Sequence, residues 1–378
     1  MSQSIDTTAL TPDQRTLVDL VSTPSVSGTE RAATEVFVHH ALQRSMAAEI
    51  DEAGNALAHR GPADAPVHIM LLGHIDTVPG DIPVRIADGV LHGRGSVDAK
   101  GPLAAMLCAA ARADLPEGVR LTVAGAVGEE TAGSPGARFL RTQHRPHACI
   151  IGEPSGWDGV TLGYKGRLLA TATAELPAAH TAADEPSAGD LACAWWQDVL
   201  AHVAGHNQDR SGVFESIQAT VQSMSSTTDG MTSRASLTAG FRLPPGVSPD
   251  DLARQLRTLA PDRVGVKCSG SELAYVTDRS DPVVRCLSNA IRESGARPRP
   301  KRKTGTADLN VVGPVWGCPI AAYGPGDSAL DHTPHERLAL GEFDRSVGVL
   351  CRALTALGSE LLQHHTATAN LERASVHA

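Results

Sequence analysis

The sequence predicts a mixed α/β fold that carries an inserted α+β domain, and three observations lead to this prediction. Short apolar runs of buried-strand character alternate with helical stretches at 67–73, 121–128 and 149–152. In the middle of the chain the pattern changes to strand, helix, strand, strand, helix, strand, which is typical of an α+β sandwich. A length of 378 residues also exceeds a usual single core. The expected boundaries are residues 1–165 and 277–378 for the main domain and 166–276 for the insert.

Composition and charge exclude several classes of protein. Hydrophobic residues make up 42% and charged residues 20% of the sequence, which is ordinary for a globular protein in water. The formal net charge of −9 argues against a nucleic-acid-binding protein, because attraction to phosphates needs a basic surface. The seven cysteines are scattered without a Cys-x-x-Cys pair, so we expect reduced thiols in a cytoplasmic protein.

The two ends of the sequence are polar. Residues 1–6 lack the basic region and the apolar region of a signal peptide, so we expect none here. No apolar run reaches the length of a membrane span, and we expect no membrane partner. The tail at 364–378 has no apolar periodicity, which predicts that it is frayed.

Side chains that commonly bind metal ions follow each of the three apolar runs. His74 and Asp76 follow the first run. Glu129 and Glu130 follow the second, and Glu153 follows the third. Because ligands of open α/β sheets bind at the carboxyl ends of the strands, we expect these side chains to converge. The spacing of two residues puts His74 and Asp76 on one side of the strand end, so the Asp76 carboxylate could accept the second ring N–H of a metal-bound imidazole.

A glycine-punctuated loop at 93–101 delivers one further carboxylate, Asp98, to the start of an apolar helix. We interpret Asp98 as the bridge between two metal ions. A phosphate-binding loop is excluded, because no Gly-x-Gly-x-x-Gly opens this helix and no Gly-Lys-Ser/Thr follows.

Five blocks of the chain, in order, resemble the metal-site blocks of the dinuclear zinc aminoacylase superfamily, which includes carboxypeptidase G, acetylornithine deacetylase and succinyl-diaminopimelate desuccinylase. The blocks are residues 73–79, 93–101, 128–130, 152–154 and 323–334. Residues 303–310 and 324–327 are most similar to the branch that releases lysine or ornithine. The resemblance implies a zinc-peptidase-like catalytic domain with a mixed sheet. It also implies a ferredoxin-like insert that serves as a lid or dimerisation domain, and hence a homodimer.

The resemblance assigns roles to the residues of these blocks. It implies two Zn²⁺ ions, for which Co²⁺ could substitute. The ligands would be His74 and Glu153 on one ion, Glu130 and His332 on the other, and Asp98 between them. Neighbouring residues at a strand end tend to point apart, so Glu129 can face the bridging water while Glu130 binds metal. Glu129 would then accept the proton of the water and pass it to the departing amine.

Further residues are expected to contact the substrate. His180 resembles an insert-domain histidine that polarises the scissile carbonyl in a neighbouring active site, although Thr181 stands where serine is usual. A surface histidine is the alternative. Arg242 resembles the arginine that binds the substrate α-carboxylate, with an ordinary strand-end arginine as the alternative. Asp308 or Asp327 could receive a cationic side chain, or each could cap a helix or a turn. The expected substrate-binding set is Arg242, Lys303, Thr304, Asp308, Gly326 and Asp327.

We therefore expect a metal-dependent amide hydrolase that releases a lysine-like or ornithine-like amino acid, as in lysine or arginine biosynthesis. The substrate would be an N-acylated amino acid, attached either to an acetyl group or to the C-terminal glutamate of an acidic amino-group carrier protein. A basic run at 297–303 could steer such a carrier or could be solvated surface. The alternatives are a dipeptidase or carboxypeptidase of the same fold and a non-catalytic protein that binds a metal or an amino acid.

Overall fold

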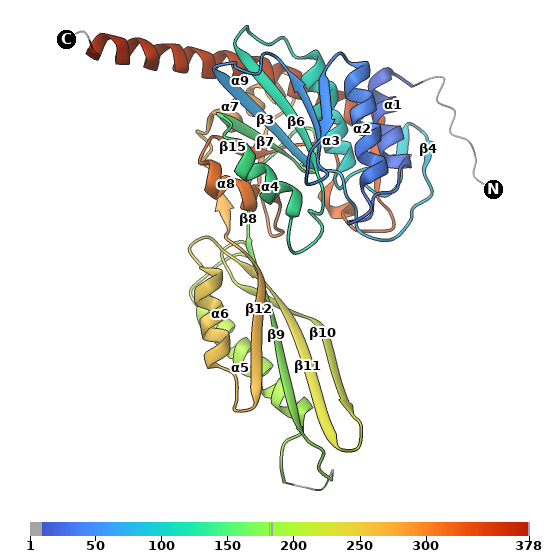
Figure 1. Ribbon diagram of the computed structural model, residues 1–378, viewed down its shortest axis with the longest axis vertical. Helices are drawn as coiled ribbons and strands as arrows, with labels where there is room; N and C mark the ends of the chain where they lie inside the picture. Colours follow the sequence, from blue (N-terminus) through green and yellow to red (C-terminus); the bar gives the residue numbers. More distant parts are fainter. Residues whose placement is uncertain (1–9, 181, 183, 377–378) are drawn as a thin grey trace. The chain divides into compact units, whose positions relative to one another are not determined.

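Figure 1 shows the computed structural model, which describes residues 10–180, 182 and 184–376. The chain divides into two compact units. Unit 1 comprises Met1–Gly163, Thr277–Lys301 and Ala307–Ala378, and unit 2 comprises Tyr164–Val276 and Arg302–Thr306. Residues 1–6, in which we expect no signal peptide, lie outside the described residues, as does Thr181. The role of the insert as a lid or dimerisation domain stays a prediction.

A mixed sheet lies at the centre of unit 1, so the predicted α/β class is confirmed. Seven of the nine described strands of this sheet are β1 (Ala47–Ile50), β2 (Ala56–Arg60), β3 (Val67–His74), β6 (Val119–Ala126), β7 (Ala148–Gly152), β8 (Gly159–Tyr164) and β15 (Ile320–Ala322). Their order across the sheet is β1-β2-β6-β3-β7-β15-β8. β3 runs parallel to both β6 and β7, and β15 runs parallel to β7. The carboxyl ends of β3, β6 and β7 therefore meet at one edge.

Helices pack around this sheet and bury its parallel strands. They are α1 (Pro12–Ser22), α2 (Arg31–Gln43), α3 (Lys100–Arg112), α4 (Pro135–Gln143), α7 (Pro282–Glu293), α8 (Asp308–Trp316) and α9 (Leu340–Val376). α3 packs against β3 and β6, α9 packs against β3, and α7 and α8 pack against β15. Almost every residue of β3 and β6 is buried, which explains why these strands read as continuous apolar runs.

The C-terminal helix α9 continues to Val376, so the expectation of a frayed tail from residue 364 is wrong. The first part of α9 packs against α3 and α7. A helix that packing has already nucleated extends residue by residue when good helix formers follow. Residues 367–374, Ala-Thr-Ala-Asn-Leu-Glu-Arg-Ala, include several such residues.

A small three-stranded sheet joins segments that are distant in the sequence. Its strands are β4 (Arg85–Ala87), β5 (Val90–His92) and β16 (Arg337–Ala339), in the order β16-β5-β4. β16 pairs antiparallel with β5, with Arg337 opposite His92. This pairing brings the segment that follows His332 beside the segment that leads to Asp98.

Unit 2 is a four-stranded antiparallel sheet with two helices. Its elements are β9 (Gly166–Pro177), α5 (Ala188–Asn207), β10 (Gln218–Thr228), β11 (Thr232–Leu243), α6 (Pro249–Thr258) and β12 (Val264–Glu272), which follow the predicted strand and helix order. The order across the sheet is β10-β11-β9-β12. The helices enclose a separate hydrophobic core around Trp195. The indole of Trp195 donates a hydrogen bond of 3.0 Å to the Leu256 carbonyl oxygen, one of the last four carbonyls of α6.

Among the described helices, none combines the length and the apolar character that crossing a membrane requires.

Candidate metal centre

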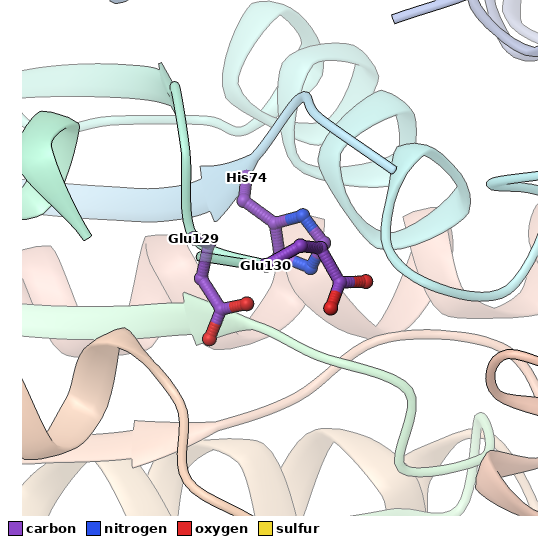
Figure 2. A group of neighbouring side chains, drawn as sticks. All are labelled: His74, Glu129 and Glu130. Carbon is purple, nitrogen blue, oxygen red and sulfur yellow. The ribbon is translucent and has the colours of Figure 1, made fainter. Parts of the chain in front are cut away.

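The ends of three neighbouring strands carry the donor groups of unit 1. His74 is the last residue of β3 and lies opposite Ala126, the last residue of β6. Glu129 and Glu130 follow β6, and Glu153 follows β7. Figure 2 shows the side chains of His74, Glu129 and Glu130 gathered where these strands end. Donor atoms of these three side chains lie within 4.8 Å of one another.

Asp98 lies between the two predicted histidine ligands. Its Oδ1 is 3.2 Å from His74 Nε2, and its Oδ2 is 3.0 Å from His332 Nε2. His74 Nε2 is also 3.9 Å from a carboxylate oxygen of Glu153, and His332 Nε2 is 2.9 Å from one of Glu130. The side chains therefore form two groups that share Asp98. Each group places one imidazole and two carboxylates within 4.8 Å of one another.

This donor set fits a pair of divalent ions. Each group offers one imidazole nitrogen and carboxylate oxygens, which are the ligand types of catalytic zinc sites. A shared carboxylate can bind two closely spaced ions at once, one with each oxygen. The two groups differ in depth, because the His74 side chain is 2% exposed and the His332 side chain 52% exposed. His332 also has a left-handed backbone, with a φ of 60°, which is unusual for a residue other than glycine.

In the metal-free protein, protons on the two imidazoles compensate the negative charge of the carboxylates. Burial opposes the charge on His74, but hydrogen bonds with Asp76 and Asp98 raise its pKa well above the ordinary value. Hydrogen bonds with Asp98 and Glu130 raise the pKa of His332 to about 10. Burial likewise opposes the charge on Asp98, but His332 and His74 lower its pKa. Because metal-bound imidazoles are not protonated, a metal ion must displace these protons.

Asp76 connects the end of β3 to the Glu129-Glu130 segment. Its carboxylate accepts hydrogen bonds from the main-chain N–H groups of Glu129 and Glu130, both at 3.1 Å, and from the Ser27 hydroxyl at 2.7 Å. His74 Nδ1 lies 3.0 Å from the main-chain oxygen of Asp76 and 3.5 Å from its carboxylate. The main-chain oxygen is thus the nearer acceptor for the ring N–H, although we expected the carboxylate. Either acceptor leaves Nε2 directed toward Asp98.

Glu129 has the electrostatic environment of a group that exchanges protons. Burial raises its pKa well above the ordinary value. The charge of His74 opposes this rise, whereas Asp308, Glu153 and Glu130 add to it. A carboxylate whose pKa is raised in this way is suited to general acid–base catalysis.

Unit 2 contains one residue predicted to be catalytic, His180, and three predicted to bind substrate, Arg242, Lys303 and Thr304. His180 is exposed, and its Nδ1 accepts a hydrogen bond from the Ala182 N–H at 3.1 Å. Arg242 donates a hydrogen bond of 2.7 Å to the Thr306 hydroxyl. The Lys303 ammonium lies 5.8 Å from the centre of the Tyr164 ring. Thr304, the fourth predicted residue of this unit, is exposed.

The predicted substrate-binding residues of unit 1 differ in depth. Asp308 is 2% exposed in the first turn of α8. Asp327 accepts a hydrogen bond of 3.0 Å from the Ala329 N–H and caps a short 3₁₀ helix, which supports its turn-capping alternative. Gly326 has a φ of 105°, and a Cβ there would lie 2.8 Å from a Val97 methyl group. Only glycine fits this close approach to the residue before Asp98.

Residues of the predicted basic run contact nearby groups of their own unit. Arg299 forms an ion pair with Asp158, and the Lys301 ammonium donates a hydrogen bond of 2.5 Å to the Ser155 carbonyl. Arg297 is exposed. Part of the run therefore has a structural role in addition to any role in steering.

Glu336 was missed by the sequence analysis. It is fully buried, and its carboxylate accepts hydrogen bonds from the main-chain N–H groups of Val97 and Asp98. The signal that could have revealed it is a glutamate four residues after His332, immediately before a strand.

Imidazole and carboxylate donors at the strand ends of a mixed sheet are suited to metal-dependent hydrolysis. The model of Peptidase family M20/M25/M40 matches residues 70–356. The chain belongs to this family and is a hydrolase that acts on amide bonds.

Two curated relatives align over most of the chain. The [LysW]-lysine hydrolase of Deinococcus radiodurans is 46% identical over 359 residues, which cover 92% of this chain and 98% of that protein. The putative [LysW]-lysine/[LysW]-ornithine hydrolase of Thermococcus kodakarensis is 39% identical over 341 residues, which cover 89% of this chain and 90% of that protein.

Solved structures of the same family share the fold. The M20 family metallo-carboxypeptidase Sso-CP2 of Sulfolobus solfataricus superposes with a TM-score of 0.75 at 15% identity and covers 92% of this chain and 100% of that one. The YXEP protein of Bacillus subtilis, described as a dinuclear metal binding peptidase, gives a TM-score of 0.66 at 13% identity and covers 92% and 98%.

Metal binding should release protons and should weaken as the pH falls. The pKa of His332 is raised from 6.5 to about 10, so this imidazole is protonated at pH 8 in the metal-free protein and must release that proton to the buffer when an ion binds. By the same shift, His332 stabilises the metal-free fold fully below pH 6.5 and loses this effect as the pH rises toward 10. Calorimetric titration with Zn²⁺ in two buffers of different ionisation enthalpy measures the released protons. Binding without proton release would contradict this account.

Proposed function

We propose that this chain hydrolyses the amide bond that attaches a lysine-like or ornithine-like amino acid to the C-terminal glutamate of an amino-group carrier protein. The observation that carries the proposal is the pair of donor groups that share Asp98, in a chain 46% identical to a protein named [LysW]-lysine hydrolase. An N-acetylated basic amino acid is the second candidate substrate. The reaction would serve the biosynthesis of lysine or arginine. Dipeptidase or carboxypeptidase activity has only the support of the shared fold.

The proposed cofactors are two Zn²⁺ ions, with Co²⁺ as a possible substitute. The proposed ligands are His74 and Glu153 on one ion, Glu130 and His332 on the other, and Asp98 shared by both. A donor set of imidazoles and carboxylates without thiolates suits either metal. When bound, the ions would supply Lewis acidity that polarises the scissile carbonyl and acidifies a water molecule.

The chain's own residues would move the proton of the reaction. Glu129 would accept a proton from the attacking water and deliver it to the departing amine, and its raised pKa supports this role. Asp76 would hold the main chain of Glu129 in place through its hydrogen bond of 3.1 Å. The same carboxylate receives the N–H group of Glu130, so one residue would position the base and a metal ligand together.

The charge of the site supports a cationic substrate. The carboxylates of this region are those of Asp76, Asp98, Glu129, Glu130, Glu153 and Asp308. Six carboxylates exceed the four positive charges that two divalent ions would bring. The buried Lys100 ammonium interacts with Asp76 and offsets one further negative charge, so a single negative charge would remain to attract an ammonium group. Asp308 is buried and interacts electrostatically with Glu129, which makes it the proposed partner of the substrate side chain. Its position in the first turn of α8 is an alternative reason for a carboxylate there.

The homodimer is proposed from the edge of the sheet in unit 2. β10 is an edge strand of eleven residues, and residues 220–228 are exposed. It contains no charged residue and no proline, whereas natural edge strands usually carry such residues to prevent pairing with another chain. We therefore propose that β10 pairs with β10 of a second copy. In such a dimer His180 would act on the scissile carbonyl in the active site of the partner.

Replacing the proposed base should stop turnover and leave metal binding intact. We expect Glu129→Gln to lower kcat by about 10²- to 10⁴-fold, since general base catalysis contributes about that much. The assay follows amino-acid release from carrier-linked lysine, acetyl-lysine, acetyl-ornithine and dipeptides, with carrier-linked lysine as the preferred substrate of the wild type. Glu35→Gln, at an exposed glutamate paired with Arg31, is the control with unchanged activity. Wild-type kcat in the Glu129 variant would refute its role as the base. Faster hydrolysis of dipeptides than of carrier-linked lysine by the wild type would refute the proposed substrate.

Removing the charge of Asp308 should affect basic substrates selectively. We expect Asp308→Asn to lower kcat/KM by about 10- to 100-fold for a substrate with a lysine side chain, because a hydrogen bond to a charged group contributes about 1.5–3 kcal/mol. The kcat/KM of the analogue with a norleucine side chain should fall less, because that analogue has no charge to pair with Asp308 and is affected only through the lowered pKa of Glu129. Asp327→Asn is the matched control, since Asp327 caps a turn and should affect both substrates alike. Equal losses on both substrates in the Asp308 variant would contradict the proposed contact.

Two inactive variants should restore activity together if His180 acts across a dimer. We expect His180→Ala and Glu129→Gln each to be inactive when produced alone. When they are produced together in equal amounts, random pairing should restore about a quarter of the wild-type sites. The measurement is specific activity, with light scattering to determine the oligomeric state. A monomer in solution, or no recovery in a mixed dimer, would exclude this arrangement.

A further inference from the structure

The buried carboxylate of Glu336 contacts the loop that carries Asp98. Its Oε1 accepts hydrogen bonds from the Val97 N–H at 2.9 Å and the Asp98 N–H at 3.0 Å. The main chain of the same residue accepts a hydrogen bond of 3.4 Å from the Gly93 N–H. Two successive N–H groups bound to one oxygen fix the direction of the backbone at Asp98, and hence the place from which its carboxylate extends.

Arg94 links this carboxylate to the segment after His332. Its Nη1 donates a hydrogen bond of 2.7 Å to Glu336 Oε2 and one of 3.2 Å to the Thr333 carbonyl. Its Nε donates to the Gly80 carbonyl at 3.1 Å. One guanidinium therefore holds the residue that follows His332 and the carboxylate that holds Asp98. Its planar donor geometry makes such a multiple contact possible, which a lysine could not reproduce.

The small sheet fixes the position of both partners. Glu336 directly precedes β16, and the pairing of Arg337 with His92 places it beside Gly93. Arg94 follows Gly93 in the chain. The carboxylate is fully buried and the Arg94 side chain is 13% exposed, so the ion pair is largely shielded from water. Neither residue belongs to the proposed ligand set, yet their contacts reach the loops of two of its members.

We propose that Glu336 and Arg94 form a clamp that holds Asp98 and His332 in register, so that one buried ion pair determines the affinity for both metal ions. Asp98 is the ligand common to both ions in the proposed function, on which this inference rests. A displacement of its carboxylate therefore weakens both sites, whereas a change at an ordinary ligand weakens one. Glu336 and Arg94 are positioning residues and take no part in the chemistry.

The test compares Glu336→Gln with a control variant at a residue that does not contact a loop bearing a proposed metal ligand. Glutamine keeps the size of the side chain but loses the charge that pairs with Arg94. We expect the Kd values of both ions to rise by about 10- to 100-fold, as is typical when a partner of a metal ligand is lost. The measurements are calorimetric titration of the metal-free full chain with Zn²⁺ or Co²⁺, the visible absorption of bound Co²⁺, and the Tm of the metal-free protein.

Asp281→Asn is the matched control. The Asp281 carboxylate also accepts two main-chain N–H groups, from Val283 at 2.8 Å and Ile320 at 3.2 Å, at the start of α7. We expect this variant to lower the Tm without changing either Kd. If Glu336→Gln does not fold, Arg94→Lys keeps the charge and allows the same comparison.

The Kd and Tm values together distinguish a role in metal binding from a structural role. A higher Kd for both ions in the Glu336 variant, with unchanged Kd values in the control, supports the clamp. Wild-type Kd values in a variant with a lowered Tm would overturn it, because the role would then be structural only. A higher Kd for only one of the two ions would overturn the coupling between the sites. A wild-type chain that binds no divalent ion would instead refute the metal assignment of the proposed function, and the clamp with it.

Discussion

The need to compensate buried negative charge governs the construction of the metal centre. Asp76, Asp98 and Glu336 are each at most 9% exposed, and an ionised carboxylate at this depth is costly without partners. Main-chain N–H groups compensate the charge of Asp76. Main-chain N–H groups and the Arg94 guanidinium compensate the charge of Glu336. These partners are fixed parts of the fold. Asp98 instead contacts two imidazoles, so protons or metal ions can supply its positive charge.

The donor groups at strand ends could be predicted because a topological rule connects sequence and space. His74 ends a buried strand, Glu153 directly follows one, and Glu130 lies four residues after the end of another. The carboxyl ends of these parallel strands meet at one edge. The rule does not apply to His332, because this residue lies in an irregular segment and has a left-handed backbone. Only the resemblance to a known family pointed to it. The order of elements in unit 2 could be predicted because each element there has a clear period of its own.

Other features could not be predicted because they depend on contacts between distant parts of the chain. The strands β4, β5 and β16 have three residues each, which is too short for a recognisable alternation. The hydrogen bond between Val97 and Glu336 joins residues 239 positions apart. The nearest acceptor of the His74 ring N–H is a main-chain oxygen, and the main chain is the same for every residue type. The helical C-terminal segment was missed because a helix can extend without an apolar face once its beginning is packed.

The unequal depth of the two histidines has a consequence for how the centre fills and empties. The imidazole of His74 is almost completely enclosed, whereas about half of the His332 side chain is open to solvent. In the proposed ligand set, an ion held by His74 would be more enclosed than one held by His332, which water or a chelator could reach more readily. The two positions would then differ in residence time although they share a carboxylate. In dilute chelator, the ion beside His332 would then be lost first.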